Sequence, residues 1–225
     1  MKVSTSQIFE RATAQMAKQQ VKVADMQTQL ATGKQMVRPS DNPEQGALIQ
    51  RLSTALDRQD VYAGNLNAIS NRLEAEETAL MSSENILQRV RELAVQANNG
   101  TLSADDRIII ATEVSALRDE LVSLGNSKDI SGNYVFAGAM TQTKPFVENV
   151  GGTVSYRGDQ TRTMVAVSDQ RQLQLNRPGN EAFASVVRET DGVSARVGFF
   201  TVIDDFTAAL NSNDTASLQD SLVEV

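Results

Sequence analysis

Pairs of neighbouring carboxylates are the residues best suited to acid–base chemistry or to binding a cation. Examples are Glu76 with Glu77, Asp105 with Asp106, and Asp204 with Asp205. Both kinds of chemistry require several groups to converge on one point, whereas neighbouring residues on a helix point in divergent directions. The 225 residues include no histidine and no cysteine, which removes the commonest transition-metal ligands, thiolate nucleophiles and disulfides. We therefore assign the pairs to helix starts and solvated faces, and predict no catalytic, cofactor-binding or metal-binding residue and no enzymatic activity.

The tripeptide Arg157-Gly158-Asp159 has the composition of adhesive motifs, whose charged ends bind a receptor. Three common residues are a weak signal, and these three follow a predicted strand at a point where a turn is expected. We interpret the tripeptide as a turn. The chain contains neither a glycine-rich phosphate loop nor a nucleophile elbow, so its function must be sought in how its elements assemble.

The composition excludes two further classes of function. The formal net charge is −7 and the basic residues are scattered among acids, whereas a nucleic-acid surface needs clustered lysine and arginine. No apolar run reaches the roughly 20 residues of a membrane helix, and residues 1–10 lack the apolar core of a signal peptide. We predict binding to neither nucleic acid nor membrane. The absence of cysteine fits a reducing compartment and equally fits a protein that is exported unfolded.

The longest pattern in the chain is an apolar seam between Pro43 and Asn98. Its steps of three and four residues are typical of a helix that packs against another helix. Unbroken, this helix would be a rod of roughly 80 Å at about 1.5 Å rise per residue, which favours assembly over catalysis. The predicted rod core comprises Leu52, Leu66, Ile69, Leu73, Leu80, Leu87 and Val90, with Ala55, Tyr62, Ala94 and Ala97 on the same register and Gln59, Glu76 and Ser83 as polar interruptions.

A shorter seam predicts a helix from Ser4 to about Gly33. Ser4 and Gln7 have the spacing of a reciprocal cap, and Gly33 is a natural stop. An isolated helix with so narrow a stripe is only marginally stable in water, so we expect it to order in an assembly or against a second helix. The alternative is an amphipathic helix docked on the long rod. The predicted assembly seam is Phe9, Ala12, Met16, Val23, Met26 and Leu30, with Gln19 as its polar occupant.

A joint separates these two helices. Pro39 and Pro43 each disfavour a helical residue before them, and Asn42 has the side chain of an N-cap for the helix that Pro43 opens. The long helix is predicted to end at Asn98-Asn99-Gly100, because these residues tolerate a left-handed backbone.

A third helix is predicted to begin after Ser103, with Asp105 and Asp106 in its first turn near the positive end of the helix dipole. Its connection to the long helix is short, so the two helices are expected to form an antiparallel hairpin. The apolar positions that continue the pattern are Ile110, Val114, Leu117, Leu121 and Leu124.

The period changes after residue 133, where short β-prone runs begin with Tyr134 to Gly138 and Gly151-Gly152 indicates a hairpin turn. Helical spacing returns at Phe199, and the chain stops within a helix that starts at Thr215. We expect a C-terminal part that would complete the rod to be missing. The predicted fold class is α+β, mainly α, with long antiparallel coiled-coil-like helices and a small antiparallel β domain inserted. The predicted domains are 1–42 (terminal assembly helix and joint), 43–133 plus 196–225 (rod core), and 134–195 (β domain).

Several segments taken together resemble the bacterial flagellin superfamily. The most specific is Leu30-Ala31-Thr32-Gly33-Lys34 followed by Pro39-Ser40-Asp41-Asn42-Pro43, and a second runs from Arg91 to Ser103 with Asp106-Arg107 after it. Tyr134 to Gly138, Thr143, Pro145-Phe146 and Tyr156 to Asp159 are more similar to the branch that joins the flagellar hook to the filament than to filament flagellin.

The resemblance implies a structural subunit of the flagellum, exported by the flagellar type III apparatus without a cleaved signal peptide, and an extracellular location. It implies assembly through terminal helices into a ring of copies between a neighbouring hook-associated protein and flagellin. It also implies that residues 1–33 pair with a C-terminal helix and that an export chaperone binds a C-terminal region, for which this chain has no matching positions. The alternatives are a filament flagellin and a generic coiled-coil module that binds another protein.

Overall fold

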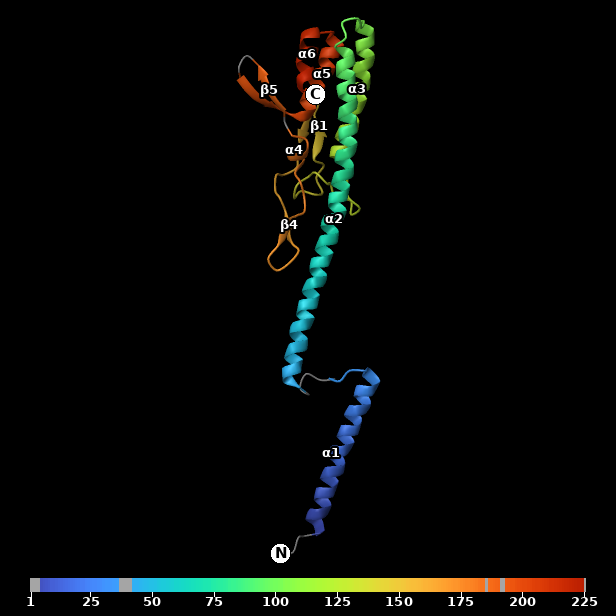
Figure 1. Ribbon diagram of the computed structural model, residues 1–225, viewed down its shortest axis with the longest axis vertical. Coiled ribbons are helices and arrows are strands. Elements are labelled where there is room, and N and C mark those ends of the chain that lie inside the picture. The colour runs from blue at the N-terminus through green and yellow to red at the C-terminus, as the bar shows by residue number, and fades with distance from the viewer. Residues whose placement is uncertain (1–4, 37–41, 185, 191–192, 225) are drawn as a thin grey trace. The chain divides into compact units, whose positions relative to one another are not determined.

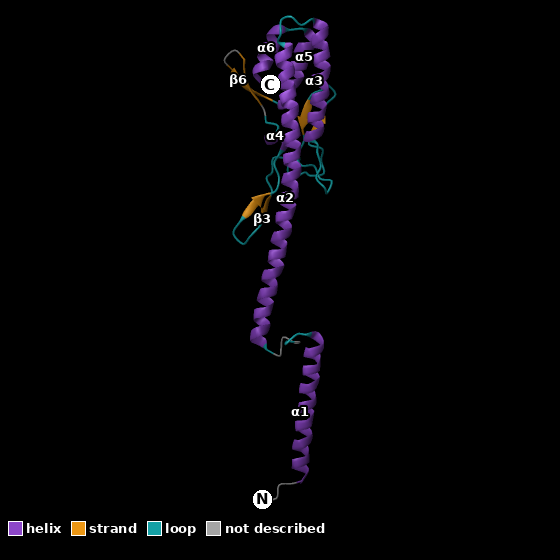
Figure 2. Cartoon of the chain, turned by 45° about the vertical axis from the view of Figure 1, so that its right-hand side comes forward, coloured by secondary structure: helices purple, strands orange, loops and turns teal. Residues whose placement is uncertain are grey.

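The computed structural model describes residues 5–36, 42–184, 186–190 and 193–224 (Figure 1). The chain divides into two compact units, Met1–Asp60 and Val61–Val225. The described chain is mainly helical with small antiparallel strand pairs (Figure 2), which confirms the predicted fold class. Because the division falls inside a helix and residues 134–195 lie in the same unit as the helices after residue 60, the three-part domain scheme stays a prediction.

In the first unit, α1 (Thr5–Thr32) forms as the seam predicted. Gly33 follows it with φ +64°, a left-handed conformation that glycine adopts without a steric penalty and that ends helices. The predicted cap residue Ser4 lies outside the described residues. Every described side chain of α1 from Ser6 onward is exposed except Gln29, which is partly covered. The helix therefore exists without burying its apolar seam in the chain described here.

The start of α2 (Pro43–Ala97) is built as the sequence predicts. The Asn42 side-chain oxygen accepts a hydrogen bond from the Gln45 N–H at 3.2 Å, and the Asn42 carbonyl accepts one from Gly46 at 2.8 Å. The side-chain bond satisfies one of the backbone donors that a helix start leaves open, and the Gly46 bond is the first of the regular helical bonds. Pro39 and the other residues of 37–41 lie outside the described residues.

The buried stripe of α2 differs from the predicted rod core. Ile69 and Val90 are buried and Leu80 and Leu87 pack at the edge of the core, whereas Leu52, Leu66 and Leu73 are 56%, 45% and 48% exposed, so their place in a rod core stays a prediction. The stripe contains two of the three predicted polar interruptions, Glu76 and Ser83, but not Gln59. Its members are Ile69, Arg72, Glu76, Ala79, Ser83, Ile86, Val90, Leu93, Ala94 and Ala97.

The two sets of residues differ because the buried face of α2 is rotated about the helix axis relative to the predicted face, and the two faces share one line of positions. The prediction and the structure agree on positions 69, 76, 83, 90 and 97, but the sequence favoured the leucine line on one side of them, whereas the bundle lies against Arg72, Ala79, Ile86 and Leu93 on the other. The contact on this face is crowded, so a small alanine fits where a leucine would not, and an arginine can be buried there because it has hydrogen-bond partners. Leu52 differs for another reason, because it belongs to the first unit, where the described part of α2 is exposed.

The helical core of the second unit contains α3 (Ala104–Gly125), α5 (Phe199–Ser212) and α6 (Thr215–Glu224) packed with the last part of α2 (Figures 1 and 2). Ser103 and Asp106 form the reciprocal cap of α3, each side chain accepting the other residue's backbone N–H at 3.2 Å. The hydrogen bonds from Ser103 hold the pKa of Asp106 below its usual value. The predicted helical hairpin and the predicted helical return after residue 197 are both confirmed.

The strands form separate two-stranded antiparallel pairs within the described residues. They are β1 (Phe146–Glu148) with β2 (Val154–Tyr156), β3 (Met164–Ala166) with β4 (Gln172–Gln174), and β5 (Val186–Thr190) with β6 (Val193–Val197). The predicted turn at Gly151-Gly152 connects β1 and β2. Residues 134–138, predicted to be β-prone, make only single bridges at Tyr134 and Ala137 and otherwise turn.

An aromatic cluster attaches the β1–β2 hairpin to the helices. The Phe146 ring lies 5.2 Å from Phe183 and 5.3 Å from Phe200 between centroids, and Phe136 lies 5.5 Å from Phe183. Such edge-to-face pairs add about 0.5–1.5 kcal/mol each beyond the area they bury. The cluster joins β1, the segment after α4 (Gly179–Ala182) and the start of α5 in one core.

Candidate assembly surfaces and their support

The predicted assembly seam on α1 is a continuous exposed line. Its six members repeat at heptad spacing and therefore share one helix face, and all of them are exposed, with Phe9 at 74% and Leu30 at 87%. Burial of one such large side chain stabilises a contact by about 1.5–3 kcal/mol. The face is thus suited to a helix partner. The line comprises Phe9, Ala12, Met16, Val23, Met26 and Leu30.

A second exposed apolar group lies on α2 within the first unit. Large apolar side chains that monomeric proteins normally bury are more than half exposed here. A contiguous apolar surface of this kind marks an interaction site. The group comprises Leu48, Ile49, Leu52 and Leu56.

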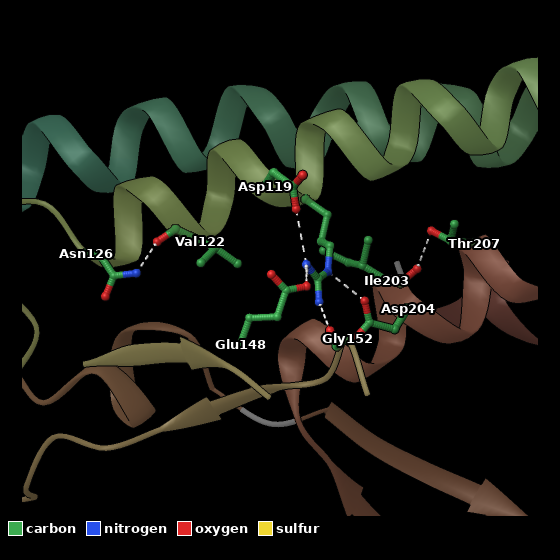
Figure 3. Close-up of polar contacts among 9 residues, drawn as sticks. Asp119, Val122, Asn126, Glu148, Gly152, Ile203, Asp204 and Thr207 are labelled. Atoms are coloured by element: carbon green, nitrogen blue, oxygen red, sulfur yellow. Dashed lines mark hydrogen bonds and ion pairs between the residues drawn. The ribbon is translucent and has the colours of Figure 1, made fainter. Parts of the chain in front are cut away.

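The second unit contains a polar cluster around Arg118 of α3, whose partners Asp119, Glu148, Gly152 and Asp204 are labelled in Figure 3. The Arg118 side chain is 8% exposed, and its Nε donates to Asp204 of α5 at 2.7 Å. Its Nη1 donates to Glu148 of β1 at 3.1 Å and to Asp119 at 3.1 Å, while Nη2 donates to the Gly152 carbonyl in the β1–β2 turn. Burial opposes the charged form, but the bonds to Asp204 and the other carboxylates outweigh it, so the pKa of Arg118 lies above its usual value.

The Arg118 contacts fix three elements with one guanidinium. Hydrogen bonds to charged groups are roughly twice as strong as neutral ones, and the planar fork of arginine sets directions as well as distances. The sequence analysis missed this residue. The sequence did contain a signal for Arg118, since it lies on the helix face that carries the apolar Val114 and Leu121. A charge at such a core position needs a partner from another element.

A second buried arginine attaches the segment after α3 to α2. Arg72 donates to the Val135 carbonyl at 2.8 Å and to the Tyr134 carbonyl at 3.2 Å, and lies 3.7 Å from Asp129. These bonds use the carbonyls that a strand at 134–138 would have needed, which explains the turns found there. One turn along α2, buried Glu76 pairs with Arg177 at 3.3 Å. Burial lowers the pKa of Arg72 and raises the pKa of Glu76.

The β3–β4 hairpin contacts α2 closer to its start. The Tyr62 hydroxyl donates to Asp169 at 2.8 Å, and the Asn65 side chain donates to the Ala166 carbonyl at 2.8 Å. Tyr62 is correspondingly half-buried. These contacts begin at the point in α2 where the second unit begins.

The remaining polar candidates of the sequence have structural partners. Asp159 accepts hydrogen bonds from the Ala139 N–H at 2.8 Å and the Thr161 N–H at 3.0 Å, which hold its pKa below its usual value. A Cβ at Gly158 would lie 2.4 Å from the Tyr156 hydroxyl. The Arg157-Gly158-Asp159 tripeptide is therefore a turn whose carboxylate is engaged internally.

The carboxylate pairs do not converge on one another. Asp204 bonds Arg118, and Asp205 bonds Arg188 at 2.8 Å. Among residues 5–36, 42–184, 186–190 and 193–224, no group of acidic side chains has the arrangement of a metal site. None of the helices in that part of the chain is both long enough and apolar enough to span a membrane.

Comparison with known proteins places the chain in a family. Residues 3–141 match the bacterial flagellin N-terminal helical region. Flagellar hook-associated protein 3 of Salmonella typhimurium is 32% identical over 216 residues, covering 94% of this chain and 67% of the relative, and the Escherichia coli protein of the same name gives the same values. The crystal structure of Xanthomonas campestris FlgL has a TM-score of 0.69 at 27% identity, covering 76% of this chain and 84% of that one.

The chain therefore belongs to the bacterial flagellin family, in the branch formed by flagellar hook-associated protein 3. Filament flagellins match less of it. Flagellin FlaB1 of Treponema pallidum is 31% identical over 123 residues, which cover 55% of this chain. The likeness to the hook-associated protein covers 94% of the chain and therefore extends beyond residues 3–141 into the strand pairs and α5.

Proposed function

We propose that the chain is a non-enzymatic structural subunit that joins the flagellar hook to the filament. The observation that carries this function is the match to hook-associated protein 3 over 94% of the chain, which includes the Arg118 cluster and the strand pairs. In this role the second unit, with its closed core, supports the first unit, which makes the assembly contacts. The chain's partners are further copies of the chain in a ring, a neighbouring hook-associated protein on the hook side and flagellin on the filament side.

The exposed α1 seam supports assembly through helix pairing. Six positions at heptad spacing on one face, all exposed, provide a stripe that a second helix can cover. The proposed partner is an apolar helix face supplied within the assembled flagellum. Export through the flagellar type III apparatus and an extracellular location accompany this proposal, as does a chaperone that binds the family's C-terminal region.

The function is tested by adding purified protein to isolated hooks and observing their ends by electron microscopy. A junction subunit stops after forming a short cap, and flagellin added afterwards extends only the capped hooks. Unlimited growth from the chain alone would instead identify a filament subunit. No binding to hooks, with binding to unrelated apolar helices, would favour the generic coiled-coil module.

A matched pair of variants tests the part played by the α1 seam. Val23 lies on the seam, whereas Val21, two residues earlier, points to the opposite side of the helix, and both are exposed. Val23→Asp should abolish capping because a charge enters the helix contact, while Val21→Asp should cap normally. Equal behaviour of the two variants would exclude the seam as the contact.

A further inference from the structure

The connection between α2 and α3 contains an asparagine–glycine dipeptide that belongs neither to the α1 seam nor to the Arg118 cluster. Asn99-Gly100 is the only asparagine–glycine pair in the sequence, and it lies at the end of the helical hairpin (Figures 1 and 2). Both residues are exposed. Asparagine followed by glycine is the pair in which the next backbone nitrogen reaches the side-chain amide most easily, because glycine has no Cβ to obstruct it.

The hydrogen bonds of Asn99 make its side-chain carbonyl more susceptible to attack by the Gly100 nitrogen. Its Oδ1 accepts from the Thr101 N–H at 3.1 Å and from the Thr101 hydroxyl at 2.9 Å. Two donors on a carbonyl oxygen draw electrons from its carbon and stabilise the negative charge that develops when a nucleophile adds. The side-chain carbonyl is thus held and polarised by the residue that follows Gly100.

The attacking and leaving nitrogens are both unengaged. Within the part of the chain that the structure describes, no acceptor is bonded to the Gly100 N–H or to the Asn99 Nδ2. The Gly100 nitrogen can therefore lose its proton to solvent, and once its covalent bond to Cγ breaks, Nδ2 can leave without giving up a hydrogen bond to the protein. A hydrogen-bonded amide would resist both changes.

Asn126 provides a contrast within the same molecule. Its Nδ2 donates to the Val122 carbonyl at 2.8 Å (Figure 3) and to the Phe146 carbonyl at 2.9 Å, and its Oδ1 accepts from the Phe146 N–H at 2.9 Å. Serine follows it in the sequence. Its amide is anchored at both ends.

We propose that Asn99 is a site of spontaneous deamidation in the folded protein, with the Gly100 nitrogen as nucleophile. That nitrogen gives its proton to a solvent base and forms a bond to Asn99 Cγ. The Cγ–Nδ2 bond then breaks, and Nδ2 takes up a proton and leaves as ammonia. Water adds to one of the two carbonyl carbons of the resulting five-membered imide, the bond from that carbon to the Gly100 nitrogen breaks and the nitrogen takes up a proton, giving aspartate or isoaspartate at position 99.

The modification changes the end of the helical hairpin. Either product places a negative charge beside the C-terminus of α2, where the helix dipole disfavours it. Isoaspartate also lengthens the main chain by one carbon within the turn that Leu102 closes by donating to the Asn99 carbonyl at 3.1 Å. We expect the modified chain to unfold at a lower temperature.

The test incubates the full folded chain at neutral and at mildly alkaline pH and follows each asparagine by peptide mapping with mass spectrometry. Asn99 should be converted before Asn98 and Asn126, faster at the higher pH, with release of ammonia. Conversion of other asparagines while Asn99 stays an amide would overturn the proposal.

Variants separate the two chemical contributions. Gly100→Ala should abolish the Asn99 product over the same incubation, and the fold accommodates it because no atom lies within 4 Å of the added Cβ. Gly64→Ala, equally open but preceded by alanine, serves as the control that leaves the reaction unchanged. Thr101→Val removes the hydroxyl donor and should slow the reaction. An unchanged rate in Gly100→Ala would overturn the mechanism, and an unchanged rate in Thr101→Val would overturn the role of Thr101.

Discussion

Helices with regularly spaced apolar residues serve different purposes in the two units. In Met1–Asp60 the apolar positions of α1 and of the first part of α2 are exposed, whereas in Val61–Val225 one apolar face each of α2, α3 and α5 packs in a closed core with aromatic and arginine contacts. An apolar stripe in a sequence therefore specifies that a helix has a partner, not that the partner belongs to the same chain. The second unit provides its own partners, and the first presents a surface to others.

The largest expected difference in stability is between two variants that carry the same leucine-to-aspartate substitution in different parts of α2. Leu93→Asp places an unpaired charge in the closed core and should cost about 4 kcal/mol or more, or prevent folding. Leu52→Asp should change stability by no more than about 0.5 kcal/mol, because its site is exposed. Thermal and denaturant unfolding measure both, and a large loss in Leu52→Asp would mean that the first unit also has a closed core.

Replacing Arg118 tests how the second unit is stabilised. Arg118→Met leaves Asp204 and Glu148 without their cation and should cost about 2–3 kcal/mol, less than the 3–5 typical of a fully buried pair, because Glu148 is exposed. Amide exchange in β1–β2 should also accelerate. Arg89→Met, which removes an exposed ion pair with Glu113, is the control and should have little effect. Equal losses in the two variants would refute the central role of Arg118.

The reciprocal cap of α3 has a smaller expected effect. Ser103→Ala removes the acceptor for the Asp106 N–H and should lower the free energy of unfolding by about 1 kcal/mol. Ser115→Ala changes an exposed serine within the same helix and should be neutral or slightly stabilising, because alanine is the better helix former. A neutral Ser103→Ala would show that the cap does not limit stability.

The buried Glu76 gives a pH dependence of definite sign. Burial raises its pKa in the folded state, so the folded state binds the proton more tightly and stability falls as pH rises from the ordinary value of 4.5 through the raised pKa. Glu76→Gln removes this fall, and the stability of the variant relative to the parent should increase across that window in pH-dependent unfolding curves. Glu77→Gln changes the same charge on the exposed side and should not reproduce the effect.

Local signals in the sequence were sufficient to predict much of the fold. Asn42, Ser103 with Asp106, and Gly33 each act within a few residues of their partners, so their roles are readable without tertiary structure. The buried face of α2 could not be predicted, because Arg72 and Ala79 fit the core only through contacts with the segments that pack on them. Tyr134 to Gly138 had β propensity, but Arg72 takes two of the carbonyls there.

The candidate surfaces and their support also include one part that the sequence could predict and one that it could not. The α1 seam followed from heptad spacing, and its exposure agrees with the expectation of a partner outside the helix itself. The Arg118 cluster could not be predicted, because Glu148, Gly152 and Asp204 lie far from Arg118 in the sequence and approach it only in the folded bundle.

Amide hydrogen exchange on the free chain, and on the same chain assembled on hooks, can show directly whether the first unit gains its partners only on assembly. We expect fast exchange across residues 5–32 in the free chain, slow exchange in the core of the second unit, and strong protection of residues 5–32 after assembly. Strong protection of residues 5–32 in the free monomer, or no gain in protection on hooks, would contradict this expectation.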